Sequence, residues 1–192
     1  MAEWLSRRMV EQGIIKEDDE ELYQFGIRNG AIILLNVITA LLIGLFTTKL
    51  IVVIIFTLSF MTLRSYSGGY HSDSRVFCYL GSNLVLFIPV YTGWLFLEML
   101  PLAVIITLVW VVVIIMILSP MHSKKRKLDQ TEKKYFSRKA RMIVFIQSIV
   151  FGVFWYLRLS EYAYAIYSSI CIISVFMLVG KVQLLIQLYM EE

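Results

Sequence analysis

The sequence has little of what metal sites, disulfide frameworks and soluble proteins require. Its 192 residues include two cysteines, two histidines and three prolines, and 17% of them are charged. Two cysteines cannot form a disulfide framework, and two histidines without a CxxC pair are too few for a zinc site. We therefore expect no metal and no cofactor. Soluble domains carry about 25% charged residues, so the low charge also argues against a soluble protein.

Apolar residues are what the sequence has in excess. The chain is 59% hydrophobic and its mean hydropathy is +0.75, whereas soluble domains are about 45–50% apolar. A soluble core of this length could not bury so much apolar surface. The sequence predicts an all-α fold, a polytopic transmembrane helix bundle in which residues 1–192 form a single integral membrane domain.

Six apolar runs are candidates for transmembrane helices. Several are short: a run of fourteen residues, such as residues 50–63, makes a helix of about 21 Å, against a hydrocarbon core of about 30 Å. The alternative is four spans with two re-entrant or interfacial segments. We expect about six spans, at residues 31–46, 50–63, 79–97, 102–118, 142–156 and 162–179.

The segment before the first span is strongly charged. Residues 1–28 carry eleven charges, five of them in the run from Glu17 to Glu21. The early apolar core of a secretory signal is missing. Residues 1–30 are therefore predicted to form cytoplasmic or interfacial helices with a break in the acidic run, and the tail from Lys181 a short interfacial helix.

Basic residues are distributed unequally between the two sides of this arrangement. With the N-terminus inside, sixteen of the eighteen basic residues fall on inner segments and two, Lys49 and Arg158, on outer turns. The positive-inside rule predicts such an imbalance. Both termini and the two long loops between spans should be cytoplasmic.

The loop between the second and third predicted spans concentrates the polar chemistry. It contains His71 and Cys78, one of two histidines and one of two cysteines, and the adjacent pair Gly68 and Gly69. A cysteine nucleophile needs a base and an electropositive setting. Ser72 or Asp73 is a suitable helix cap that would put Cys78 near a helix N-terminus, where the dipole favours thiolate; Arg75 adds positive charge.

The spacing of His71 and Cys78 restricts how they could meet. Seven residues of one helix separate them by about 10.5 Å along its axis, too far for a hydrogen bond. His71 must therefore lie outside the helix and fold back, and the glycine pair permits that bend. A solvated loop histidine and a packed cysteine are the alternative interpretation. Cys171 lies mid-span with no base nearby and is predicted to be core.

A second charged segment, residues 124–141, carries nine basic residues against two acidic ones. One interpretation is anchoring on anionic membrane lipid, at about 1 kcal/mol per basic residue. The other is docking of an acidic peptide segment. A nucleic-acid partner is not expected, because no folded reader surrounds the patch. The basic run at its start comprises Lys124, Lys125, Arg126 and Lys127.

The glycine pair followed by Tyr70 and His71, with Cys78 seven residues after the histidine, resembles the accessory gene regulator B (AgrB) family of Gram-positive quorum sensing. The similarity extends along nearly the whole chain, since the length, the charged N-terminal segment and the basic second half also match. It implies a membrane cysteine endopeptidase that cleaves an AgrD-type propeptide. It also implies transfer of the acyl group within the peptide, which closes a thiolactone or lactone ring.

The same resemblance implies roles for individual residues. Cys78 matches the nucleophile and His71 the general base, while Arg64 and Gly69, beside Gly68, match motif positions required for activity. The basic cluster at Lys124, Lys125 and Arg126 matches residues important for processing, and Lys127 and Arg75 join the predicted substrate-binding set. A third catalytic member is not assigned by the motif; Asp73 and Asn83 are the candidates.

Other functions remain open at the level of the sequence. A non-enzymatic membrane scaffold or exporter component for a peptide is the alternative to the peptidase. A metal-dependent lipid-modifying enzyme would require clustered aspartates, which the sequence lacks. The expected location is the cell membrane of a Gram-positive bacterium with the active site on the cytoplasmic side. The oligomeric state is open, with a homodimer as a candidate.

Overall fold

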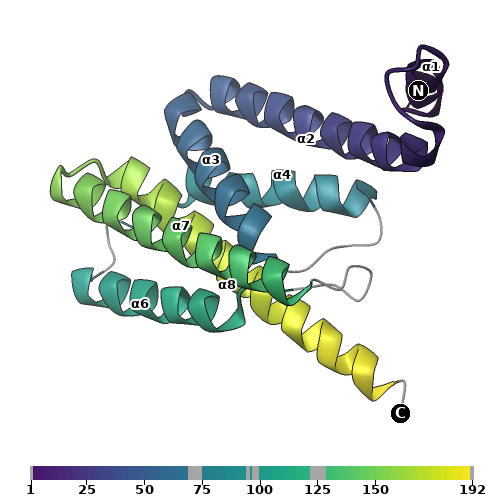
Figure 1. Ribbon diagram of the computed structural model, residues 1–192. Coiled ribbons are helices and arrows are strands. Elements are labelled where there is room, and N and C mark those ends of the chain that lie inside the picture. The colour runs from purple at the N-terminus through teal and green to yellow at the C-terminus, as the bar shows by residue number, and fades with distance from the viewer. Residues whose placement is uncertain (1, 69–74, 94–95, 97–99, 122–128, 191–192) are drawn as a thin grey trace. The chain divides into compact units, whose positions relative to one another are not determined.

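The computed structural model consists of helices joined by short turns within the ranges that it describes (Figure 1). These are residues 2–68, 75–93, 96, 100–121 and 129–190; for residues 75–78 the backbone alone is described. Within these ranges there is no strand, and five helices are long and apolar enough to cross a membrane. Both findings confirm the predicted all-α polytopic bundle.

The helices alternate with short connections along the chain. They are α1 (Ala2–Glu11), the 3₁₀-helix η1 (Glu17–Asp19), α2 (Glu20–Phe46), α3 (Leu50–Ser67), α4 (Arg75–Tyr91), α6 (Pro101–Leu118), α7 (Gln130–Tyr156) and α8 (Ser160–Tyr189). The candidate spans lie in α2, α3, α6, α7 and α8, whereas α4 has 17 residues. A count of six spans and a single membrane domain stay predictions.

The chain divides into two compact units, residues 1–39 and residues 40–192. In the first, the N-terminal unit, α1 contacts the beginning of α2 through polar side chains. Arg28 forms an ion pair with Glu3, and the Ser6 hydroxyl donates to a Glu20 carboxylate oxygen at 3.3 Å. The short η1 interrupts the helices within the acidic run, where the sequence predicted a break.

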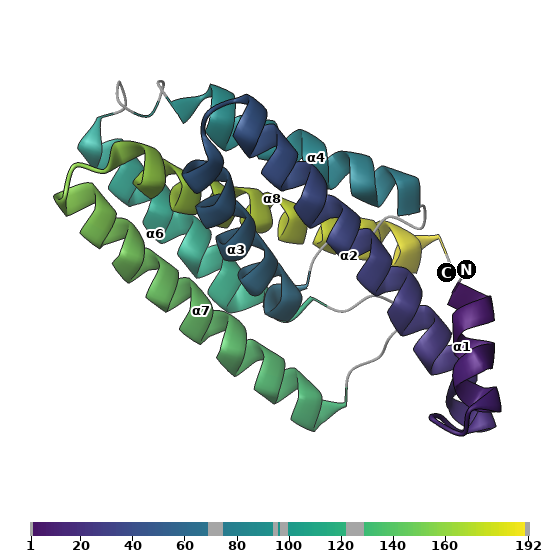
Figure 2. The same ribbon diagram turned by 90° about the horizontal axis from the view of Figure 1, so that it is seen from above.

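In the second unit, the bundle, α8 packs against α3, α4, α6 and α7 (Figure 2). Small residues on α8 permit this close approach, as they do in other membrane helices. Four of them are buried: Ala163, Ala165, Ser168 and Ser169. The largest fully buried apolar side chains come from all sides of the bundle: Phe56, Leu63, Ile115, Val144, Ile170, Ile173 and Met177.

The two ends of the bundle are defined by contacts between its connections. At one end, the turn end, the Lys49 ammonium lies 3.1 Å from the Glu161 carboxylate. At the other, the site end, the backbone N–H of Met121 donates to the carbonyl oxygen of Ser67 at 2.9 Å. Helices α3, α6 and α8 therefore run from the turn end toward the site end, and α4 and α7 run back.

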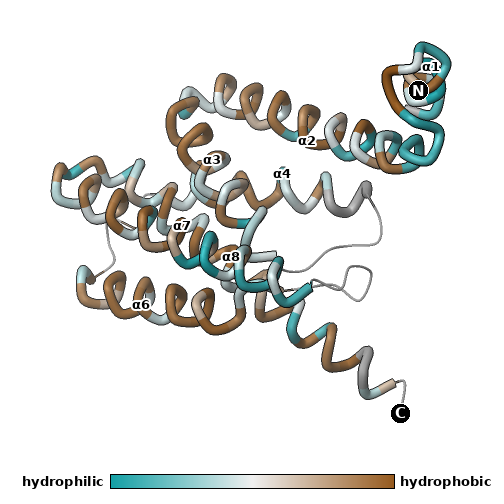
Figure 3. Tube along the Cα trace, viewed as in Figure 1, coloured by the Kyte–Doolittle hydropathy of each residue, from teal (hydrophilic) through white to brown (hydrophobic). Residues whose placement is uncertain are grey.

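The outer surface of the bundle is apolar, as a lipid-facing surface should be. Figure 3 shows hydrophobic residues along nearly all of α6 and a hydrophilic stretch in the first half of α7. On α6, Leu102, Trp110 and Ile117 are each about two-thirds or more exposed, at 68%, 65% and 73%. Apolar side chains this exposed are typical of membrane spans rather than of soluble helices.

One polar cluster lies inside this apolar bundle. The Gln147 side-chain amide donates to the carbonyl oxygen of Ser59 at 2.8 Å, and the hydroxyls of Ser59 and Ser169 are 2.5 Å apart. These bonds join α3, α7 and α8. The Gln147 amide N–H and the two serine hydroxyls thus find partners where lipid and core offer few, whereas the Gln147 side-chain oxygen is buried without a partner among the described residues.

Most helices extend beyond the predicted spans, and α7 and α8 do so most clearly in charged segments. Helix α7 begins at Gln130, so residues 130–141 of the predicted basic loop are helical. A capping box formed by Asp129 and Glu132 begins this helix. Helix α8 continues to Tyr189, so the tail after Lys181 is not a separate helix. Hydropathy marks where the apolar run ends, but a helix continues through charged residues that have good helix propensity.

Candidate active site

The end of α3 is fixed by a close contact with the segment after α6. Gly68 has φ +74° and ψ −148°, a backbone conformation that is essentially reserved for glycine. A Cβ at this position would lie 2.2 Å from the carbonyl oxygen of Met121. Ser67, which accepts the hydrogen bond from Met121, is fully buried. Glycine is therefore required at position 68 both by the backbone and by its neighbour.

Arg64 lies one turn earlier, with its side chain against two aromatic rings. Its guanidinium carbon is 4.9 Å from the ring centroid of Phe176 and 5.8 Å from that of Phe60. Phe60 belongs to α3 and Phe176 to α8, so the guanidinium sits where the two helices meet. This contact brings the predicted motif arginine into the bundle at its site end.

The candidate nucleophile lies at the beginning of α4. Cys78 is the fourth residue of this helix, which begins at Arg75, and so lies in its first turn. The N-terminus of a helix carries a partial positive charge that favours a thiolate. The roles of Cys78 and Arg75 stay predictions. In the same loop, three predicted site residues lie outside the described residues: Gly69, His71 and Asp73.

Asn83, the other candidate for a third catalytic member, lies farther along α4. Its side-chain amide donates to the carbonyl oxygen of Tyr79 at 2.8 Å. Five residues separate it from Cys78, or about 7.5 Å along a helix. Its candidacy stays a prediction.

Described residues before and after the basic run contact the end of α3. Lys124, Lys125, Arg126 and Lys127 themselves lie outside the described residues, but both flanks are described. On the first flank Met121 contacts Ser67 and Gly68. On the second, the Phe136 ring of α7 lies 6.0 Å from that of Tyr66 in the last turn of α3. Met121 and Phe136, which come before and after the basic run, therefore both contact the last turn of α3 or the residue that follows it.

The described residues thus join two segments that the sequence separates widely. The residues from Gly68 to Cys78, here called the motif loop, begin at Gly68, and the basic run begins three residues after Met121. Gly68 and Met121 are in contact. Among the described residues, no group of three or more histidine, cysteine, aspartate or glutamate side chains could hold a metal ion.

Sequence reasoning missed Phe60, Phe176 and Met121 as parts of this site. Their contacts join α3 to α8 and to the end of α6, and no local pattern marks such long-range partners. Phe176 looks like any other apolar residue of its span. The two phenylalanines become informative only beside Arg64.

Cys171 lies in the middle of α8 and is partly buried against the core. This is the position expected of a packed cysteine. Four residues earlier, the Tyr167 ring packs against Phe96 and Phe151. Cys171 lies five residues, or about 7.5 Å along the helix, before Phe176, whose ring contacts Arg64.

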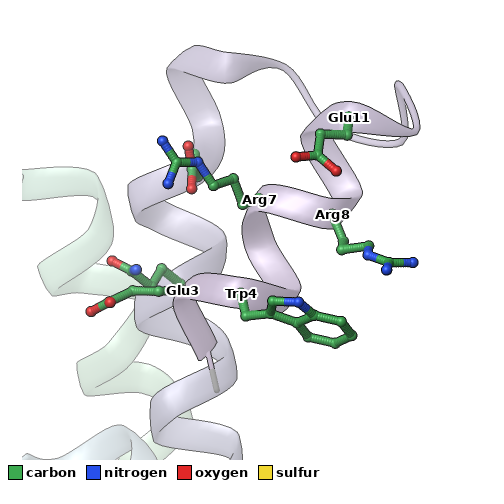
Figure 4. A pocket seen from close by; sticks show the side chains of 7 residues that line it. Glu3, Trp4, Arg7, Arg8 and Glu11 are labelled. Atoms are coloured by element: carbon green, nitrogen blue, oxygen red, sulfur yellow. The ribbon is translucent and has the colours of Figure 1, made fainter.

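The N-terminal unit contains a hollow of about 420 Å³ (Figure 4). Both signs of charge line it: its residues are Glu3, Trp4, Arg7, Arg8, Glu11, Glu20 and Gln24. The Arg8 guanidinium lies 5.0 Å from the centroid of the Trp4 ring, and Trp4 is 60% exposed. An exposed tryptophan beside an arginine is typical of helices at a membrane surface. None of the predicted site residues lines this hollow.

Comparison with protein families gives one match, to Accessory gene regulator B, over residues 1–178. The chain belongs to this family. Membership assigns the protein to the processing of an AgrD propeptide in quorum sensing, and the five apolar helices agree with a multi-pass membrane protein. Comparisons with curated proteins and with solved structures found no match.

Proposed function

We propose that this AgrB protein is a membrane-embedded cysteine endopeptidase in which Cys78 is the nucleophile and His71 the general base. The observation that carries the proposal is the place of Cys78 in the first turn of α4. Helix α4 begins seven residues after Gly68 and packs against α3. The helix dipole and the neighbouring Arg75 both favour the thiolate there.

The proposed reaction has two acyl transfers. His71 takes the proton of the Cys78 thiol, and the thiolate attacks the scissile carbonyl of an AgrD-type propeptide. The C–N bond breaks, the leaving amine takes the proton from His71, and the upstream part remains as a thioester on Cys78. A thiol or hydroxyl of the peptide then gives its proton to His71 and attacks this carbonyl, so that the thioester bond breaks, the ring closes and Cys78 leaves as the thiolate.

A cysteine suits the second transfer better than a serine does. Exchange of one thioester for another changes the bond type very little, so transfer to a peptide thiol is nearly neutral in free energy. An oxygen ester on the enzyme would be less well matched to a thiolactone product. Asp73 and Asn83 are the candidates to orient His71.

The active site is proposed to face the cytoplasm of a Gram-positive cell, where a newly made propeptide is met. Support comes from the charges: the nine basic residues of 124–141 follow the site end, whereas the turn end carries Lys49 and Arg158. The basic run Lys124 to Lys127, with Arg75, would bind an acidic part of the propeptide. Contact with anionic lipid and a homodimer stay predictions.

The peptidase is tested by replacing each cysteine in turn. We expect Cys78→Ser to abolish cleavage of a synthetic AgrD-type propeptide by the purified protein in detergent, and Cys171→Ser to keep it. Mass spectrometry of the quenched wild-type reaction should find an acyl group on Cys78. A non-enzymatic scaffold or exporter component would cleave nothing and would not be affected by either change. Substantial cleavage by well-folded Cys78→Ser would refute the assignment.

The general base is tested by the pH dependence of the same reaction. His71→Ala should lower the rate about 10²- to 10⁴-fold, the usual contribution of a general base. The remaining rate should rise with pH as Cys78 ionises without the base. A His71→Ala enzyme with the wild-type pH profile would contradict this role.

A further inference from the structure

The guanidinium of Arg64 is held by aromatic rings from two helices. Its central carbon lies over the ring of Phe176, at 4.9 Å, and over that of Phe60, at 5.8 Å. A cation within about 6 Å of a ring centroid is attracted by the negative face of the ring. We call Phe60 and Phe176 the aromatic clamp.

The clamp itself is fixed by further ring contacts. Phe176 meets Phe60 edge to face, with centroids 6.1 Å apart and ring planes at 76°. Phe60 in turn stacks on Phe56 at 5.6 Å, and both of these rings are buried. Such pairs stabilise one another beyond the area that they bury. Phe60 therefore belongs to the buried core, and Phe176 is partly buried against it.

A guanidinium suits this place better than an ammonium would. It is planar and weakly hydrated, and stacking uses its faces while its N–H donors stay at the edge. A lysine at position 64 would bring a compact, strongly hydrated charge on a flexible chain. The clamp thus fixes both the position and the plane of the Arg64 side chain.

Position matters here because Arg64 stands directly before the motif loop. The N–H of Gly68 donates to the carbonyl oxygen of Arg64 at 3.2 Å, and the contact of Gly68 with Met121 follows at once. Phe176 comes from α8, the helix that packs against α3, α4, α6 and α7. The contact between Phe176 and Arg64 therefore joins α8 to the end of α3.

We propose that Phe176, together with Phe60, is a positioning residue of the propeptide-processing site and acts by holding the guanidinium of Arg64. The inference rests on the proposed peptidase function and adds residues that the motif does not contain. Phe176 need not touch the propeptide. Its effect on the reaction passes through Arg64.

The test is a double-mutant cycle between positions 64 and 176, measured by cleavage of a synthetic AgrD-type propeptide. Phe176→Leu keeps an apolar side chain but removes the ring face, and should lower kcat about tenfold. Phe176→Tyr keeps the ring face and should stay within about threefold of wild type. In an Arg64→Lys background, Phe176→Leu should lower kcat further by less than about twofold, since the effects of coupled residues are not additive. Additive losses of kcat at the two positions, or a Phe176→Leu enzyme with the wild-type kcat, would overturn the proposal.

Phe154→Leu is the matched control. Phe154 is a partly buried phenylalanine whose ring contacts Tyr162 at 5.9 Å near the turn end, away from Arg64. The same truncation there should leave kcat unchanged and should be additive with Arg64→Lys. If Phe154→Leu behaves as Phe176→Leu does, the effect is general packing and the clamp is refuted.

Thermal unfolding of the same variants in detergent separates the clamp from the proposed function. The effects of Arg64→Lys and Phe176→Leu on the free energy of unfolding should be non-additive, whether or not the protein cleaves a peptide. An inactive wild type with a coupled unfolding cycle would refute the peptidase and leave the clamp as a structural contact without a role in processing. An active wild type, with Cys78→Ser inactive and additive losses at 64 and 176, would refute the clamp alone.

Discussion

The carbonyl oxygen of Ser67 accepts a hydrogen bond of 2.9 Å from the backbone N–H of Met121. The glycine pair of the motif loop begins at the next residue after Ser67, and the basic run begins three residues after Met121. Two segments that are distant in the sequence therefore begin at one point of the bundle.

The first prediction follows from the lack of space at Gly68. Gly68→Ala would place a Cβ 2.2 Å from the Met121 carbonyl oxygen, in a backbone conformation that disfavours any side chain. We expect it to lower the free energy of unfolding by at least about 2 kcal/mol and to abolish cleavage. Thermal unfolding and propeptide cleavage in detergent measure the two effects.

Gly152→Ala is the control for Gly68. Gly152 lies in α7 with nothing within 4 Å of the Cβ position. Alanine there should keep activity and raise stability by about 0.5–1 kcal/mol, because glycine is less favourable in a helix. A Gly68→Ala enzyme as stable and active as Gly152→Ala would show that the contact with Met121 is not needed.

The second prediction compares two neighbouring serines on α8. Both Ser168 and Ser169 are buried and donate to carbonyl oxygens of their own helix, but Ser169 also bonds Ser59 of α3. Ser169→Ala should lower the free energy of unfolding by about 0.6–1.7 kcal/mol, the range for hydrogen bonds between membrane helices. Ser168→Ala should have a smaller effect. Equal losses in an unfolding titration would contradict an interhelical contribution.

Hydropathy was sufficient to predict the helical class and the approximate places of the helices. It failed at helix ends, because the rule that finds apolar spans stops at the first charge. The beginning of α7 had a readable signal, since Asp129 followed three residues later by Glu132 is a capping-box pattern. The site was harder to predict. The contact of Arg64 with Phe176 depends on how α3 and α8 pack, and nothing local to either residue specifies it.

The third prediction concerns the side of the membrane that the site end faces. In a variant lacking both native cysteines, Lys134→Cys should react with an impermeant thiol reagent only after the cells are opened. Leu157→Cys, in the turn between α7 and α8, should react on intact cells. Both positions are exposed in the structure, so access to the residue itself does not limit either reaction. Labelling of Lys134→Cys on intact cells would reverse the proposed topology.

The last prediction separates docking of an acidic propeptide segment from anchoring on lipid. Replacing Lys124, Lys125, Arg126 and Lys127 by glutamine removes four charges. If the run docks substrate, KM should rise at low salt and its salt dependence should flatten, because the lost attraction is screened within about 8 Å at physiological ionic strength. The value of kcat, which reports cleavage of bound substrate, should change much less, since these charges need not contact the transition state.

A matched set of four charges on α7 provides the control: Lys133, Lys134, Arg138 and Lys139, replaced by glutamine together. This set removes the same charge from helical residues, whereas the first set begins three residues after the Met121 contact with Gly68. Docking beside the motif loop predicts a larger rise in KM for the first set than for the second. Anchoring predicts unchanged kinetics in detergent for both and a mixed orientation in cells. An unaltered KM for the first set at low salt would exclude docking, because the attraction between unscreened charges is strongest there.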